Sequence, residues 1–105
     1  MHNSKQMRWT ADTILDFLRN HTEELKAMGV VKIGLFGSYV RGEQSPDSDM
    51  DFLAAFESVS YRNYMNLWHF LEDSFGVKVD LGEPHTLRDE TRPNVMKEVR
   101  YIEIL

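Results

Sequence analysis

Two short runs of apolar and β-branched residues constrain the fold of this chain more than any other feature. Residues 30–36 read Val-Val-Lys-Ile-Gly-Leu-Phe, and residues 50–56 read Met-Asp-Phe-Leu-Ala-Ala-Phe. Runs of this length and composition are typical of strands with at least one buried face. We therefore predict strands at Val30–Phe36 and Met50–Phe56, separated by a glycine-containing turn and a polar stretch.

Helical periodicity appears on both sides of these strands. From an N-cap at Thr10, apolar residues recur at helical spacing as far as Met28, and Gly29 stands where a helix-ending glycine belongs. A second helix is predicted to begin after a cap at Ser58 or Ser60 and to end at Gly76. The apolar residues expected to face the core are Ala11, Ile14, Leu15, Leu18, Leu25 and Met28 in the first helix, and Tyr61, Tyr64, Met65, Trp68, Leu71 and Phe75 in the second.

The C-terminal part of the chain predicts three shorter elements. They are a strand over 77–81 that ends at Gly82, a brief helix from Pro93 to about Arg100, and a final strand over 101–105. The alternation of helices and strands indicates an α+β fold, a small mixed β-sheet with helices packed on one face. We expect residues 1–105 to form a single domain, with residues 1–9 as a loosely ordered polar start.

Composition excludes several classes of function. The 105 residues include 17 acidic and 12 basic side chains, a net charge of −5, so the chain lacks the basic surface of a duplex nucleic-acid binder. The absence of cysteine excludes disulfides, thiolate zinc sites and a cysteine nucleophile. No apolar run is long enough to span a membrane, and the first residues do not resemble a signal peptide, so we expect a cytoplasmic protein.

The turn after the first predicted strand is the first candidate for chemistry. Gly37 lets the backbone approach a bulky ligand closely, the amides of the turn can point toward an anion, and Ser38 adds a hydroxyl donor. A Gly-Ser pair after a strand is also common as a simple turn, and this pair alone does not separate the two interpretations.

Three aspartates are the second candidate. Asp49 and Asp51 are two residues apart at the start of a strand, so their side chains point to the same face and can converge on one cation such as Mg²⁺. Asp80 joins that face if its strand is a neighbour of the second one. The alternative interpretations are aspartates at a solvated strand entrance and, for Asp80, a charge that protects an edge strand from aggregation.

Taken together, these residues resemble a known signature. The run GLFGSYVRGEQSPDSDMDFL (residues 34–53) is similar to that of the DNA polymerase β-type nucleotidyltransferases, and more narrowly to the minimal nucleotidyltransferases (MNT) of HEPN–MNT toxin–antitoxin modules. Their pattern is Gly-Ser, a turn that usually reads Tyr-Ala-Arg-Gly, and then Ser-Asp-x-Asp. The chain departs from it at Val40, where alanine is usual, and in residues 82–85 after Asp80, which do not match.

The resemblance implies a fold like the nucleotidyltransferase palm of polymerase β and a role for each candidate residue. Asp49 and Asp51 would bind two Mg²⁺ ions that hold a nucleoside triphosphate. Asp80 would be the third acid, sharing a metal and helping to deprotonate the attacking hydroxyl. Gly37 and Ser38 would hold the β- and γ-phosphates. Arg41 would reach the same triphosphate, unless it is only a solvated arginine on a helix surface.

The resemblance also implies a partner. An enzyme of this kind would transfer AMP from ATP to a tyrosine hydroxyl of a cognate HEPN toxin, because this short chain leaves no residues for an acceptor-binding domain of its own. The added phosphate would repel RNA from the toxin. Two alternatives stay open: a non-catalytic antitoxin that binds nucleotide and acts by complex formation, and a small-molecule nucleotidyltransferase whose pocket needs a second chain.

Overall fold

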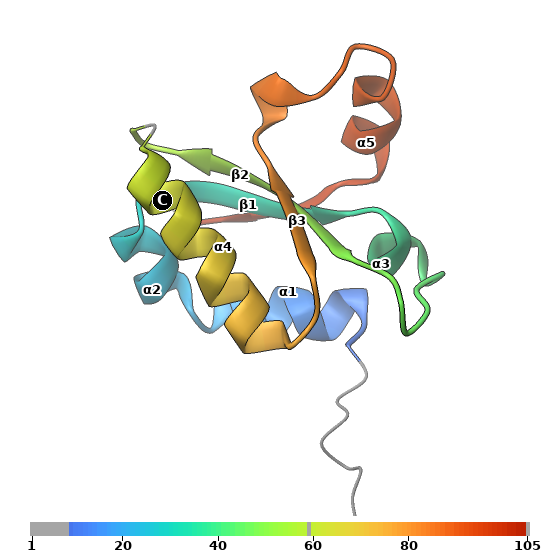
Figure 1. Cartoon of the computed structure of the whole chain (residues 1–105), viewed down its shortest axis with the longest axis horizontal. Coiled ribbons are helices and arrows are strands. Elements are labelled where there is room, and N and C mark those ends of the chain that lie inside the picture. The colour runs from blue at the N-terminus through green and yellow to red at the C-terminus, as the bar shows by residue number, and fades with distance from the viewer. Residues whose placement is uncertain (1–8, 59, 105) are drawn as a thin grey trace, which may run out of the picture.

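A four-stranded mixed sheet forms the centre of the computed structural model, which describes residues 9–58 and 60–104 (Figure 1). The strand order is β3-β2-β1-β4, with β1 antiparallel to both β2 and β4 and with β2 parallel to β3. The elements in chain order are α1 (Ala11–Arg19), α2 (Thr22–Ala27), β1 (Val30–Phe36), α3 (Ser38–Arg41), β2 (Met50–Phe56), α4 (Tyr61–Phe75), β3 (Val79–Gly82), the 3₁₀ helix η1 (Pro84–Thr86), α5 (Arg92–Glu98) and β4 (Arg100–Glu103).

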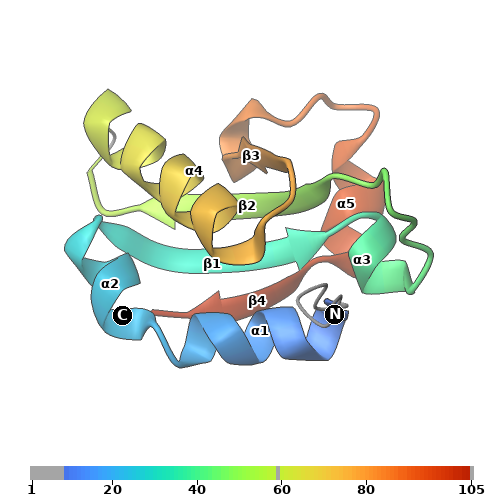
Figure 2. The same ribbon diagram turned by 60° about the horizontal axis from the view of Figure 1, so that its bottom comes forward.

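Helices α1, α2 and α4 lie along the sheet (Figure 2), and their buried apolar side chains form the hydrophobic core together with those of the strands. Alternation along the strands decides which side chains enter it: β2 places Met50, Phe52 and Ala54 in the core, while Asp49 and Asp51 belong to the opposite face. The predicted α+β fold, a mixed sheet with helices on one face, is therefore confirmed. The candidate acidic side chains are on the opposite face of the sheet, where Leu53 of β2 is also buried and η1 contacts β2.

Strands β1 and β2 have the predicted bounds, and α4 ends before Gly76 as expected; of its two predicted caps, Ser58 and Ser60, the structure has Ser60. The C-terminal elements are shifted by one or two residues: β3 starts at Val79, α5 spans Arg92–Glu98, and β4 spans Arg100–Glu103. These shifts matter little for the face each side chain occupies. None of the helices formed by residues 9–58 and 60–104 is long and apolar enough to cross a membrane.

The prediction of one continuous helix from Thr10 to Met28 is wrong, because the helix is interrupted between α1 and α2. The ring nitrogen Nδ1 of His21 lies 2.7 Å from the carbonyl oxygen of Phe17, and the two rings stack with centroids 3.9 Å apart. This side-chain hydrogen bond occupies the carbonyl to which the His21 amide would bond in a helix, and that amide instead donates to Leu18. The break turns α2 so that Leu25 is fully buried.

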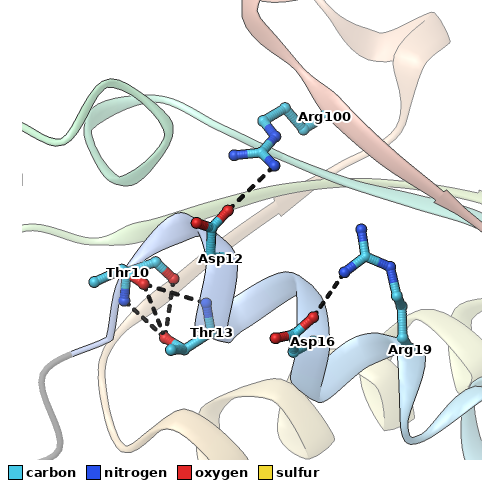
Figure 3. A network of polar contacts seen from close by, with 6 residues as sticks. All are labelled: Thr10, Asp12, Thr13, Asp16, Arg19 and Arg100. Carbon is cyan, nitrogen blue, oxygen red and sulfur yellow. Dashed lines mark hydrogen bonds and ion pairs between the residues drawn. The ribbon is translucent and has the colours of Figure 1, made fainter.

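The start of α1 is fixed by its cap and by an exposed ion pair to β4 (Figure 3). Thr10 and Thr13 form a reciprocal capping box, which satisfies backbone amides at the helix start. Asp12 lies 3.4 Å from Arg100, at the first residue of β4. Residues 1–8 of the predicted loosely ordered start lie outside the described residues. For Trp9 the prediction is wrong, because its indole nitrogen donates a hydrogen bond to the carbonyl of Phe75 at 3.0 Å.

Candidate active site

The turn that joins β1 to α3 contains Gly37 and Ser38, which we call the Gly-Ser turn. Gly37 has φ +82° and ψ −154°, a backbone conformation that L side chains rarely adopt. A Cβ atom at this position would also collide with the carboxylate of Asp51. The glycine is therefore required both by the turn geometry and by the close approach of an acidic side chain.

The strand pairing brings two of the three candidate aspartates side by side. Asp51 is paired with Phe36, the residue just before Gly37, and on its other side with Asp80 in the parallel β2–β3 ladder. Residues in register on neighbouring strands point to the same face, so both carboxylates lie on the face of the sheet opposite α1, α2 and α4. The prediction that Asp80 joins Asp51 depended on their two strands being neighbours, and β2 and β3 are neighbours in the structure.

The pKa of Asp51 is raised by burial and by several nearby negative charges. Its pKa is raised from 3.8 to about 6, first by burial and then by the negative charges of Asp80, Asp49 and Glu98, with Arg41 acting in the opposite direction. Asp49 and Asp80 are exposed, while Asp51 is half-buried. Burial and the neighbouring negative charges destabilise the ionised form of Asp51. A cation bound beside this carboxylate would relieve the repulsion, as expected where a divalent ion binds.

The acidic residues do not form a ready-made metal cage. Within residues 9–58 and 60–104, no three histidine or acidic side chains gather closely enough to hold a metal ion. Mg²⁺ is usually held by one or two protein carboxylates together with substrate phosphates and water, so a cage built from protein alone is not what this ion needs. The oxygen donors and the uncompensated negative charge at Asp51 fit Mg²⁺.

Arg41, expected at the triphosphate, is held by two glutamates on the surface of the protein. Its Nε donates to Glu43 at 2.9 Å, and its Nη1 donates to the two carboxylate oxygens of Glu98 at 2.9 and 3.2 Å. Arg41 follows the Gly-Ser turn by three residues, at the end of the four-residue helix α3. The guanidinium is therefore close to the turn and is engaged by acidic partners rather than free in solvent.

Glu98 is the site residue that the sequence did not reveal. One of its carboxylate oxygens accepts a hydrogen bond from the amide of Gly37 at 2.7 Å, across 61 residues of sequence. The residue ends α5, and Val99 separates it from β4, which returns along β1. No local motif marks it, and only the pairing of β4 with β1 brings it to the turn.

The comparisons with known proteins agree with this architecture. The family model of the nucleotidyltransferase domain matches residues 18–102. The protein adenylyltransferase MntA of Thermococcus cleftensis is 40% identical over 95 residues, which cover 89% of this chain and 96% of that protein. A solved structure assigned as a minimal nucleotidyltransferase has a TM-score of 0.73 at 30% identity, covering 89% of this chain and 96% of its own.

A more distant structural likeness concerns the fold alone. It is to a chain in the structure of a tri-AMPylated Shewanella oneidensis HEPN toxin in complex with its MNT antitoxin, with a TM-score of 0.51 at 15% identity. The match covers 83% of this chain and 71% of that one.

Proposed function

Because this chain belongs to the nucleotidyltransferase domain family, we propose that it is an antitoxin that transfers AMP from ATP to a tyrosine hydroxyl of a partner HEPN toxin. The observation that carries the proposal is the close approach of Asp51 to the Gly-Ser turn, with Asp80 in register beside it. A nucleotidyltransferase needs a phosphate-binding turn and acidic residues within reach of the same triphosphate, and the nearness of Asp51 and Asp80 to the Gly-Ser turn supports these roles. We assign the activity to the cytoplasm.

The triphosphate is bound between the turn and the acidic face in this proposal. Gly37 lets the backbone approach the β- and γ-phosphates closely, and Ser38 supplies a hydroxyl and a backbone amide to hold them, because the Gly37 amide is already bonded to Glu98. Asp49 and Asp51 would be the ligands of two Mg²⁺ ions, and Asp80 would share one of them. When bound, Mg²⁺ neutralises phosphate charge and lowers the pKa of the acceptor hydroxyl.

Arg41 adds a positive charge to the same corner. A guanidinium carries five N–H donors, more than its two glutamate partners use, so Arg41 can bind a phosphate oxygen without leaving them. The raised pKa of Asp51 supports the proposal as well, because a carboxylate surrounded by like charges gains most when a cation arrives.

The transfer itself is a displacement at the α-phosphorus. The tyrosine oxygen forms a bond to that phosphorus, the bond to the bridging oxygen of pyrophosphate breaks, and the hydroxyl proton leaves to the carboxylate of Asp80. Asp80 is suited to this step because it is exposed and can meet a side chain presented by another protein. The negative charge that AMP adds to the tyrosine then repels the RNA substrate of the toxin.

The experiment combines the purified protein with its cognate HEPN protein and Mg-ATP, followed by intact-mass spectrometry of the HEPN protein. We expect a mass increase of one or more AMP groups, located on a tyrosine by peptide mapping, and none with the Asp49→Asn/Asp51→Asn variant. An unchanged HEPN mass would refute the proposal. If the variant then still suppressed toxicity, the protein would act by complex formation, and adenylylation of an aminoglycoside-type small molecule instead would indicate the third alternative.

A further inference from the structure

Glu98 joins the end of α5 to the Gly-Ser turn, although nothing in the family signature refers to it. Its carboxylate accepts the Gly37 amide at 2.7 Å and binds the Arg41 guanidinium at 2.9 Å. Its side chain is only 22% exposed, whereas the Arg41 side chain is 47% exposed. One glutamate thus contacts two of the three residues proposed to bind the triphosphate.

The Gly37 amide needs such a partner. Gly37 is buried, and a buried amide without an acceptor carries a substantial desolvation cost. The hydrogen bond that the Gly37 amide donates to Glu98 removes that cost in the observed conformation of the turn, with φ at +82°. The carboxylate of Asp51 is packed against the same glycine. Gly37 is thus confined between Glu98 and Asp51.

From this geometry we infer that Glu98 is a positioning residue for nucleotide binding. It holds the Gly-Ser turn, and Arg41 behind it, in the arrangement that the phosphates require. The inference rests on the proposed function, since it assigns Glu98 a role at the same phosphate-binding turn. It concerns affinity for the nucleotide: a turn that is already ordered pays less conformational entropy when the phosphates bind.

Two competing roles make different predictions. If Glu98 only stabilised the fold, its removal would lower the free energy of unfolding but leave the nucleotide affinity of folded molecules unchanged. If Glu98 blocked the turn as an internal anion, its removal would raise that affinity, because a negative charge close to the triphosphate would be gone. A positioning role predicts that the affinity falls.

Three substitutions at position 98 separate the effect of side-chain length from the effect of side-chain charge. Glu98→Ala removes both contacts. Glu98→Gln keeps an oxygen that can accept the Gly37 amide but loses the charge. Glu98→Asp keeps the charge but is one methylene shorter, so it cannot reach the amide from the same backbone position. Glu103→Gln, an exposed glutamate in β4, is the matched control.

The test is isothermal titration calorimetry of each variant with Mg²⁺ and a nonhydrolysable ATP analogue, at a temperature well below the thermal unfolding midpoint of that variant. We expect Kd to rise about tenfold for Glu98→Ala and Glu98→Asp, a loss typical of a hydrogen bond to a charged group. Glu98→Gln should remain within about threefold of the unmodified protein, and Glu103→Gln within about twofold. In the transfer assay, the KM for ATP should rise while kcat changes little.

An unchanged or lowered Kd for Glu98→Ala would overturn the inference, as would a Glu98→Gln variant as weak as Glu98→Asp. If Glu98→Ala does not fold, the comparison of Glu98→Gln with Glu98→Asp decides the question alone. Failure of the unmodified protein to bind the analogue would instead refute the proposed function, and the role of Glu98 with it. The two failures are thus distinguishable from the first titration.

Discussion

Replacing Asp51 with asparagine is predicted to stabilise the metal-free protein while removing its activity. The side chain keeps its size but loses a charge that burial and the neighbours Asp80, Asp49 and Glu98 all oppose. The rise in the Asp51 pKa from 3.8 to about 6 corresponds to ~3 kcal/mol at 1.36 kcal/mol per pKa unit. Because Asp51 is partly exposed, solvent screening reduces the expected gain in the free energy of unfolding to about 1–2 kcal/mol.

The sign of the pH dependence follows from the raised pKa. Above about pH 6, Asp51 is ionised in both the folded and the unfolded protein, so the full destabilisation is present and Asp51→Asn shows its full advantage. As the pH falls from about 6 to 3.8, the folded protein takes up the proton first, and the advantage shrinks. Below that interval the carboxyl is neutral in both states, and its charge no longer separates the two proteins.

Urea denaturation in EDTA measures this effect, with unfolding curves recorded at pH 7.5, 6, 5 and 4. Asp80→Asn is the matched control, because it removes the same charge from an exposed position and should give a smaller gain. An Asp51→Asn variant that is less stable than the unmodified protein at pH 7.5, or equally stable at every pH, would refute the reasoning. Either result would mean that the carboxylate is not electrostatically strained in the folded state.

Three further predictions follow from the same structure. Gly37→Ala should lower the free energy of unfolding by at least ~2 kcal/mol in urea denaturation, because it adds a positive-φ strain and a collision with Asp51; an unchanged midpoint would mean that the turn can relax. Mg²⁺ with an ATP analogue should raise the thermal unfolding midpoint of the unmodified protein but not of the Asp49→Asn/Asp51→Asn variant, as differential scanning fluorimetry would reveal. Thr10→Ala should cost about 1 kcal/mol in urea denaturation by removing the cap of α1; an unchanged midpoint would mean that this capping box does not stabilise the folded protein.

Local sequence was sufficient for the parts of the fold that depend on short-range pattern. The apolar runs predicted the bounds of β1 and β2, and Gly76 predicted the end of α4, whose cap the sequence left open between Ser58 and Ser60. The break at His21 was not predictable in this way, because Leu18 and Leu25 are in phase with one continuous helix across the polar residues between them. There a side-chain hydrogen bond to the Phe17 carbonyl competes with the helix, and the apolar pattern does not register that competition.

In the candidate site, too, some residues could be predicted from local sequence and others depend on the tertiary structure. The spacing of Asp49 and Asp51 on a strand follows from the alternation of side chains, and the family resemblance indicated Gly37 and Ser38. The place of Asp80 depended on which strands are neighbours, which the parallel pairing of β2 with β3 supplies. Glu98 could not be found without the tertiary structure, since its contact with Gly37 spans 61 residues and depends on the return of β4 along β1.

A crystal structure of this protein with Mg²⁺ and a nonhydrolysable ATP analogue would examine the proposed chemistry without an acceptor protein. We predict metal density between the carboxylates of Asp49 and Asp51 and the phosphates, the β- and γ-phosphates against Gly37 and Ser38, and the Asp80 carboxylate turned toward the α-phosphorus. A nucleotide bound elsewhere, or metal ions that avoid both carboxylates, would contradict the account.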